Sequence, residues 1–521
     1  MSLRQVILLI LSVLTTVVVT LLLFNSWQQP QIQSRLDLAQ TNLSLQAAEW
    51  DPPEEWDLND VPGGLIGEDV YETAIAQYRD ALNSVRRTLE DNQEQRLLLS
   101  DSPVNGLPEL NQLDGAIRQA EDLKSTLELR LGILLAHGDR PEEALSLWRN
   151  LRENLDPTTR NVNVSDNAKA RTAVILIDLW NQSPPASNNP EAILTNNLSG
   201  WFRYRALSQL YRVQQEDDAL ATLEANEQEI AQKTFIRLIV LVLISGVTLL
   251  LGTILLLFLL GQLFLKGETS ILAQNKGEAW ELNWGWETIA QVIVVGFFLV
   301  FFIGQALSAA IILPRFYELA NLEADLDSSR WQAISIFLSY LLSAAAALGV
   351  LYRSLTPHFP LREDWFRFRL LPGLSWGFGG YIAAVPLVLG ISLLNQELWD
   401  GKGGSNPILE IALEGQDWVA ITCFFLTASV LAPVFEELIF RGFLLPSLTR
   451  YLPVWGAILV SSLIFAVAHL SVSEVLPLAT LGIVLGITYT RSRNLLAAML
   501  MHGLWNSGTL VSLIILGGGA T

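Results

Sequence analysis

The sequence has few of the residues on which several common classes of functional site depend. Its 521 residues include one cysteine, Cys423, which has no partner for an internal disulfide or a thiolate metal site. Basic residues are also scarce, because 33 Lys and Arg stand against 52 Asp and Glu. The net charge of −19 disfavours a nucleic-acid partner, since phosphate binding needs a basic surface. The chain also lacks a Walker-type loop, a dinucleotide fingerprint and an HExxH motif.

Charged residues of both signs are few, and this narrows the classes of protein to which the chain can belong. Charged residues make up 16% of the chain and hydrophobic residues 51%, and the mean hydropathy is +0.36. This composition excludes a disordered chain and argues against a purely soluble enzyme. At roughly 100 to 200 residues per domain, the length predicts two or more structural units. We therefore expect most of the chain to lie in a lipid bilayer.

The first apolar run covers residues 6–24 and contains no charge. At a rise of 1.5 Å per residue it comes close to crossing a hydrocarbon core about 30 Å thick. A cleaved signal peptide is the alternative interpretation, but the run is long for one and no small-x-small cleavage pattern follows it. The run predicts an uncleaved N-terminal membrane anchor, residues 1–26.

Further apolar runs occupy most of the chain after Phe235, which predicts an all-α polytopic membrane protein with about nine transmembrane helices and an inserted soluble helical domain. If the N-terminus is cytoplasmic and the helices alternate, seven arginines of the second half fall in cytoplasmic loops, as the positive-inside rule requires. They are Arg353, Arg362, Arg367, Arg369, Arg450, Arg491 and Arg493. The spans expected after the anchor are 235–264, 288–313, 332–352, 373–394, 418–440, 454–470, 475–490 and 495–516.

The inserted domain, residues 27–234, has a different composition. It carries 18 Lys and Arg against 34 Asp and Glu, so it holds −16 of the total charge. Alternation places it on the periplasmic or lumenal side. Residues 129–151 predict two helices separated by Gly-Asp-Arg, with Pro141 opening the second, and similar breaks precede Pro190 and Glu216. These units are similar to tetratricopeptide repeats, although their spacing is irregular, and an ordinary helical domain is the alternative. His137, at the first break, is expected to be solvated.

Ionisable residues inside apolar runs need a reason, because a charged side chain at mid-membrane costs about 2.5 to 3.5 kcal/mol. One such place is EELIFR, where helical spacing brings Glu437 beside Arg441. Glu436 points about 100° away and has no partner on its own helix, so it is the carboxylate free for chemistry. The alternative interpretation is that the two glutamates only form a structural ion pair with Arg441.

Two further polar positions lie in later membrane segments. His469 follows an apolar helix, and His502 and Asn506 share one helical face. Either histidine alone is typical of a hydrogen-bonded packing residue. Together with Glu436, they suit general-base activation of water and donation to an oxyanion. They equally suit a zinc site made of Glu436, His469 and His502, and spacing does not separate these alternatives.

The sequence resembles one family in three motifs. These are EExxxR at Glu436, Glu437 and Arg441, FxxxH at Phe465 and His469, and HxxxN at His502 and Asn506. They are the motifs of the CPBP family of intramembrane proteases, which includes the type II CAAX prenyl endopeptidases and Abi-like bacteriocin-processing and immunity proteins. All three occur in order in membrane segments, within residues 418–510.

The resemblance implies an endopeptidase that cuts membrane-associated proteins or peptides. It implies that Glu436 and His469 activate water, that His502 and Asn506 stabilise the oxyanion, and that Glu437, Arg441 and Phe465 support the site. Zinc is a possible cofactor, since the family is described both as metalloprotease and as glutamate-type. The alternatives are a catalytically idle relative acting as a membrane scaffold or chaperone, and a secondary transporter.

The resemblance also implies a division of the chain. Residues 235–355 would add transmembrane helices, and residues 356–521 would form the protease core. The N-terminal extension resembles that of membrane proteases of photosynthetic bacteria, which implies a bacterial plasma membrane or a thylakoid membrane. A protein partner or substrate would bind the outer helical domain, since its stacked units would form a groove.

Overall fold

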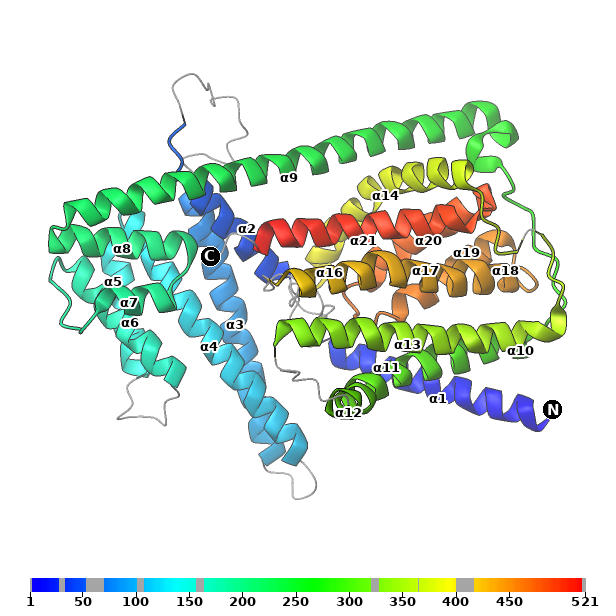
Figure 1. Ribbon diagram of the computed structural model, residues 1–521, viewed down its shortest axis with the longest axis horizontal. Helices are drawn as coiled ribbons and strands as arrows, with labels where there is room; N and C mark the ends of the chain where they lie inside the picture. Colours follow the sequence, from blue (N-terminus) through cyan, green and yellow to red (C-terminus); the bar gives the residue numbers. More distant parts are fainter. Residues whose placement is uncertain are drawn as a thin grey trace. The chain divides into compact units, whose positions relative to one another are not determined.

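The computed structural model describes residues 2–27, 33–52, 70–100, 107–155, 164–319, 328–363, 365–399 and 417–517. Within these ranges the chain forms helices and no β-strand, which confirms the all-α prediction (Figure 1). The helices cluster into two compact units. Unit 1 comprises Met1–Ile32 and Leu243–Gly517, and unit 2 comprises Gln33–Val242.

Unit 1 contains the membrane helices. Among the described residues, eight helical segments are long and apolar enough to cross a bilayer, which supports an integral, multi-pass membrane protein. The ninth predicted span is also helical, but α19 has 14 residues and a length of about 21 Å, short of the roughly 30 Å core. The eight segments are Leu3–Ser26, Asp217–Thr269, Trp286–Leu319, Ser329–His358, Leu370–Trp399, Trp418–Leu448, Val475–Ser492 and Leu495–Ile515.

Four of these segments combine more than one helical element: π-helical stretches interrupt Trp286–Leu319 and Trp418–Leu448, and a short 3₁₀ helix ends Asp217–Thr269 and Ser329–His358. In chain order, the elements of unit 1 are α1 (Leu3–Ser26), the second part of α9 (Asp217–Lys266), η1 (Gly267–Thr269), η2 (Ile271–Ala273), α10 (Trp286–Ala290), η3 (Gln291–Ile303), α11 (Gly304–Leu307), η4 (Ser308–Ile312), α12 (Leu313–Leu319), α13 (Ser329–Leu355), η5 (Thr356–His358), α14 (Leu370–Trp399), α16 (Trp418–Leu426), η6 (Thr427–Leu431), α17 (Ala432–Glu437), η7 (Leu438–Leu444), α18 (Leu445–Leu448), α19 (Val454–Val467), α20 (Val475–Ser492) and α21 (Leu495–Gly517).

Hydrogen bonds group the loops of unit 1 at two ends. At one end, Arg491 Nε donates to the Leu272 carbonyl at 2.7 Å and Arg450 Nη1 donates to the Trp284 carbonyl at 2.6 Å. These bonds join the loops that alternation assigns to the cytoplasm. At the other end, the Val472 amide donates to Ser26 Oγ at 3.1 Å and Asn395 Nδ2 donates to the Ser473 carbonyl at 2.7 Å. The structure thus groups the loops as alternation predicts, and which end faces the cytoplasm stays a prediction.

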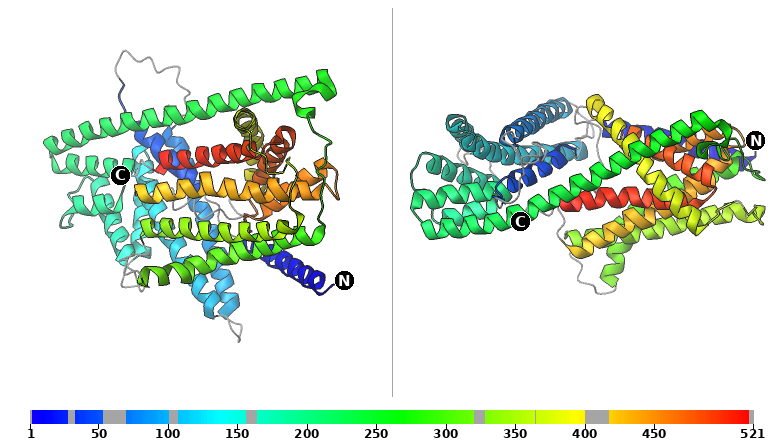
Figure 2. Two further views of the ribbon diagram at one scale, coloured as in Figure 1. Left: turned by 45° about the vertical axis from the view of Figure 1, so that its right-hand side comes forward. Right: turned by 90° about the horizontal axis from the view of Figure 1, so that it is seen from above.

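Close helix packing positions the elements that carry the three motifs. Helix α14 packs against α21 (Figure 2). A Cβ on Gly377 of α14 would come within 2.9 Å of the Leu500 side chain of α21. Helices α19 and α20 also pack together, with Gly482 against Ser462. A larger residue at either glycine would push the two helices apart. The lack of a side chain there lets α19, α20 and α21 form one bundle.

Unit 2 is a set of antiparallel helices of 8 to 31 residues before α9, and several of them start near the predicted breaks. Its elements are α2 (Gln33–Ala47), α3 (Val70–Ser100), α4 (Leu107–His137), α5 (Pro141–Asn154), α6 (Val164–Trp180), α7 (Pro190–Asn197), α8 (Gly200–Gln214) and the first part of α9. Helices α5 and α7 begin at Pro141 and Pro190, as the sequence predicts, and α9 begins at Asp217, one residue after the predicted break. Helix α6 contacts both α4 and α8, so alternate helices pack side by side.

A buried polar cluster ties the helices of unit 2 together. Glu49 Oε1 accepts hydrogen bonds from Trp201 Nε1 at 2.5 Å and from the Arg205 guanidinium. The sequence predicted a solvated His137, and the structure leaves it only half-buried, with its ring packed edge-on against Tyr71 and Trp201 at centroid distances of 4.5 and 5.5 Å. Burial, and secondly the charge of Arg205, lower the pKa of His137 to about 4. The imidazole is therefore neutral near pH 7.

A glycine in α4 gives a test of the packing of unit 2. A Cβ on Gly132 would lie 2.1 Å from Nε1 of Trp148, which is fully buried and donates to the Leu129 carbonyl. We expect Gly132→Ala to lower the free energy of unfolding by about 1 to 3 kcal/mol through overpacking. Circular dichroism of the full-length protein in detergent, with limited trypsin digestion, measures this loss.

The matched control is Gly115→Ala in the same helix, where nothing lies within 4 Å of the added Cβ. Alanine favours a helix over glycine by about 1 kcal/mol, so this variant should be as stable as the wild type or slightly more so. Equal melting temperatures for the two variants would contradict the close contact between α4 and Trp148.

Candidate active site

The centre of the candidate site is an ion pair between Glu437 and Arg441. Arg441 Nη1 donates to Glu437 Oε1 at 2.7 Å, and both side chains have no exposed surface. Arg441 Nη2 also donates to the Gly482 carbonyl of α20 at 3.1 Å. This is the i,i+4 pair that helical spacing predicts, and it joins the element that carries EELIFR to α20.

Glu437 has a second partner that the sequence did not indicate. His502 of α21 places its Nδ1 2.9 Å from Glu437 Oε1, and the ring is 3% exposed. A carboxylate oxygen accepts, so Nδ1 carries the proton and donates. One carboxylate oxygen therefore fixes both the Arg441 guanidinium and the His502 imidazole. Residues 65 positions apart carry no local signal of this contact.

The Phe465 ring lies among the charged and imidazole groups of all three motifs. Its centroid is 4.9 Å from that of His469 and 5.6 Å from that of His502, and the Arg441 guanidinium carbon lies 4.5 Å from it. His469 Nδ1 lies 2.9 Å from the Phe465 carbonyl, which can only accept. Nδ1 is therefore the donor, and Nε2 of the neutral ring has a free lone pair.

Glu436 lies beside this cluster and has a different partner. The Tyr340 hydroxyl of α13 donates to Glu436 Oε1 at 3.2 Å. The second oxygen, Oε2, is buried and has no hydrogen-bond partner among the described residues. Helical geometry predicted that Glu436 lacks a partner on its own helix, and the partner found comes from another helix. Tyr340 is a site residue that sequence reasoning missed, since only a lone tyrosine in an apolar run marks it.

Asn506 is held by a carbonyl that a proline leaves unpaired. Residues Thr427–Leu431 are π-helical, and in that geometry the Ala428 carbonyl would accept from the amide of residue 433. Pro433 has no N–H, so this bond cannot form. Asn506 Nδ2 donates to the Ala428 carbonyl at 2.7 Å instead. The proline before the Glu-Glu pair thus helps to orient Asn506.

The contacts join most of the predicted site residues into one cluster. Glu437, Arg441, Phe465, His469 and His502 form a continuous series of hydrogen bonds and ring contacts. Glu436 is adjacent to Glu437 in sequence but accepts its hydrogen bond from Tyr340. Asn506, one helical turn after His502 on α21, donates to the Ala428 backbone carbonyl. The arrangement combines a carboxylate with an unpaired oxygen, an imidazole with a free lone pair and a second imidazole held by a carboxylate. Such groups can take, hold and donate protons.

Zinc does not fit the described side chains. Among the described ranges, no three His, Cys, Asp or Glu residues are grouped so that they could hold a metal ion. The alternative of a zinc bound by Glu436, His469 and His502 therefore gains no support from the grouping of these side chains.

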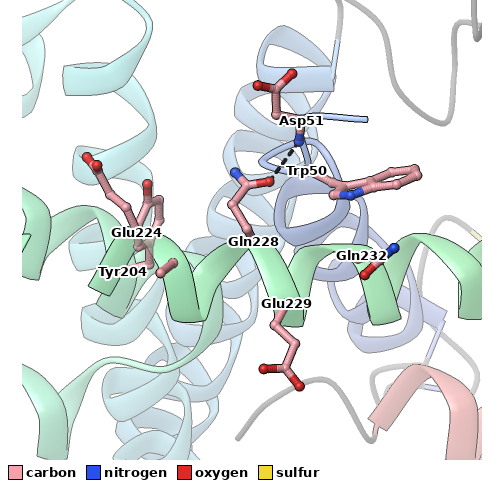
Figure 3. A pocket seen from close by; sticks show the side chains of 8 residues that line it. Trp50, Asp51, Tyr204, Glu224, Gln228, Glu229 and Gln232 are labelled. Carbon is pink, nitrogen blue, oxygen red and sulfur yellow. Dashed lines mark hydrogen bonds between the residues drawn. The ribbon is translucent and has the colours of Figure 1, made fainter. Parts of the chain in front are cut away.

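A separate cavity of about 720 Å³ lies within unit 2 (Figure 3). Gln228 Oε1 accepts from the Asp51 amide at 2.9 Å at its wall. The described residues of its lining are aromatic, amide and carboxylate residues and one alanine. The lining residues are Trp50, Asp51, Tyr204, Glu224, Ala225, Gln228, Glu229 and Gln232.

The buried ion pair predicts that Glu437 is essential to the fold. We expect Glu437→Gln to lower the free energy of unfolding by about 3 to 5 kcal/mol, because it leaves the Arg441 charge buried and unpaired. Glu318→Gln is the control: its partner Arg315 is also in unit 1, but the two side chains are 67% and 71% exposed. That variant should unfold like the wild type. Thermal unfolding in detergent compares them, and equal stability of both variants would contradict the structural role.

Comparison with known proteins agrees with the motifs. Residues 418–508 match the family model described as type II CAAX prenyl endopeptidase Rce1-like. The matched segment is less than a fifth of the chain and contains every motif residue from Glu436 to Asn506. No curated protein and no solved structure matches the chain. The match supports the resemblance to the CPBP family, with residues 418–508 as an Rce1-like domain.

Proposed function

We propose that the protein is an intramembrane endopeptidase of the CPBP type that hydrolyses peptide bonds of membrane-associated proteins or peptides. The observation that carries this proposal is the packing of His469, His502 and Arg441 around the ring of Phe465. The three motifs, far apart in sequence, thereby supply one cluster of acid, base and charge. The Rce1-like match supports the same class of activity.

In the proposed reaction, Glu436 and His469 activate a water molecule. The unpartnered Glu436 Oε2 takes a proton from water, whose oxygen then attacks the carbonyl carbon of the scissile bond. His469, whose Nδ1 donates to the Phe465 carbonyl, accepts this proton from Glu436 at Nε2 and passes it to the nitrogen of the departing amine. Breaking the C–N bond then yields a carboxylic acid and an amine, which ionise to a carboxylate and an ammonium group.

His502 and Asn506 stabilise the oxyanion that forms in this reaction. Glu437 holds the His502 ring through Nδ1, so Nε2, when protonated, is the donor to the oxyanion. The Asn506 amide has two N–H groups, and the bond to Ala428 uses one of them. Arg441 balances the Glu437 charge. The complete set of polar groups favours the protease over a catalytically idle scaffold.

A variant in which the Glu436 carboxylate is replaced by an amide tests the protease proposal. Glu436→Gln removes the base and keeps the size of the side chain, so we expect hydrolysis to fall at least 100-fold with an unchanged melting temperature. The measurement compares new N-termini in the membrane proteome of cells that make wild-type or Glu436→Gln protein. The control is Gln332→Glu, an isosteric exchange near the start of α13 in the same unit. Identical N-termini in wild-type and Glu436→Gln cells would refute the proposal.

We also propose that residues 27–234 lie on the periplasmic or lumenal side and bind a substrate or partner. The contacts of α6 with both α4 and α8 support stacked, tetratricopeptide-like helix pairs. The cavity near Trp50 and Glu224 offers aromatic, amide and carboxylate groups without a basic residue. The same proposal divides the chain after residues 26, 234 and 355 into an anchor, the outer domain, additional transmembrane helices and the protease core. It also places the protein in a bacterial plasma membrane or a thylakoid membrane.

Deletion of the outer domain separates recognition from hydrolysis. Replacing residues 40–225 by a flexible linker should keep the cleavage of a generic short membrane peptide, because the proposed catalytic groups all lie between Glu436 and Asn506, outside the deleted segment. Processing of the native substrate should be lost. Peptide hydrolysis in proteoliposomes and analysis of N-termini in cells measure the two activities. Native processing at the wild-type rate would show that the domain is a spacer.

A further inference from the structure

We infer that Tyr340 positions Glu436 for catalysis, so that α13 belongs to the active site although it lies outside the Rce1-like segment. The inference deepens the proposed protease function and rests on it. Tyr340 is 96 residues from Glu436 in sequence and precedes the matched residues 418–508. The site is therefore incomplete without a helix that the family match does not include.

The hydrogen bond from Tyr340 assigns different roles to the two oxygens of Glu436. The Tyr340 hydroxyl donates to Oε1, and Oε2 is buried without a partner among the described residues. A carboxylate held at one oxygen has a fixed plane, and its other oxygen points in a fixed direction. A base must meet its water within hydrogen-bond distance, so this restriction favours proton transfer at Oε2.

The Tyr340 ring is itself held from two sides. It is 8% exposed and packs edge-on against Phe301 of η3 and Phe435, with centroids 5.0 and 6.2 Å away. Phe435 immediately precedes Glu436, and it also contacts Phe301 at 4.6 Å. The hydroxyl therefore has little freedom to move away from the carboxylate. The three aromatic rings, from α13, η3 and α17, pack together, so the position of α13 fixes the position of the Tyr340 hydroxyl relative to Glu436.

The contact exists independently of turnover and can be measured first. We propose infrared difference spectra between two pH values for the full-length protein in lipid nanodiscs. The carboxyl bands that disappear in Glu436→Gln belong to Glu436. In Tyr340→Phe these bands should shift in frequency, because one carboxylate oxygen loses its hydrogen bond. The control Tyr381→Phe, on α14 and packed against the same hydrophobic core, should leave them in place.

Turnover is measured with a quenched fluorescent membrane peptide built on a cleavage site that Glu436→Gln cells no longer process. Tyr340→Phe should lower kcat about tenfold and leave KM within twofold, since a misplaced base slows chemistry without weakening substrate binding. Tyr381→Phe should match the wild type. Melting temperatures of both variants show whether they fold normally.

The outcomes separate the inference from the function on which it rests. If Glu436→Gln is inactive but Tyr340→Phe has wild-type kcat, the positioning role is wrong and the protease proposal stands. If the Glu436 bands do not move in Tyr340→Phe, the contact itself is wrong. If Glu436→Gln cleaves the peptide at the wild-type rate, the protease proposal fails and the positioning role fails with it.

Discussion

The buried ion pair of Glu437 with Arg441 is the interaction on which the rest of the candidate site depends. Both side chains lack any exposed surface, so each charge would be costly without the other. The same pair binds His502 of α21 and the Gly482 carbonyl of α20, and Arg441 lies over the Phe465 ring of α19. One pair of charges thus connects four segments of the bundle. Their separation would dismantle the arrangement of the imidazoles.

Two adjacent carboxylates take different roles because a helix turns by about 100° per residue. That rotation directs Glu437 toward Arg441 and His502, where both partners bind the same oxygen. It directs Glu436 toward α13, where Tyr340 binds one oxygen and the other has no hydrogen-bond partner among the described residues. Glu437 is held in a buried ion pair, whereas the described contact of Glu436 is with a neutral hydroxyl, and this difference supports the proposal that Glu436 is the base. Helical geometry alone separates a supporting residue from a candidate base.

Departures from regular helix geometry contribute to the site as well. The π-helical stretch Thr427–Leu431 and the missing amide of Pro433 leave the Ala428 carbonyl to Asn506. A second π-helical stretch, Leu438–Leu444, carries Arg441. π-Helical turns are uncommon and are frequent at functional sites, because they change which side chains face inward. At Ala428 a regular backbone hydrogen bond is absent, and the carbonyl instead orients the Asn506 side chain.

The sequence by itself determined the features that depend on near neighbours along the chain. Apolar runs predicted the membrane helices, Pro141 marked the start of a helix, and i,i+4 spacing paired Glu437 with Arg441. Helical periodicity sets these contacts within a few residues, so they can be read from spacing. Their places in apolar runs singled out the histidines and Asn506, and the resemblance to a family implied their roles, but neither indicated the partners that hold them.

Only the tertiary structure decided the contacts between distant segments. The bonds of His502 to Glu437 and of Tyr340 to Glu436 cross 65 and 96 residues, and the His137 ring packs against Tyr71 and Trp201. Such contacts follow from which helix faces pack together. That choice depends on the fit of many side chains at once, including close approaches at Gly377 and Gly482. Because no local spacing encodes that fit, the partner of each catalytic candidate became visible only in the folded chain.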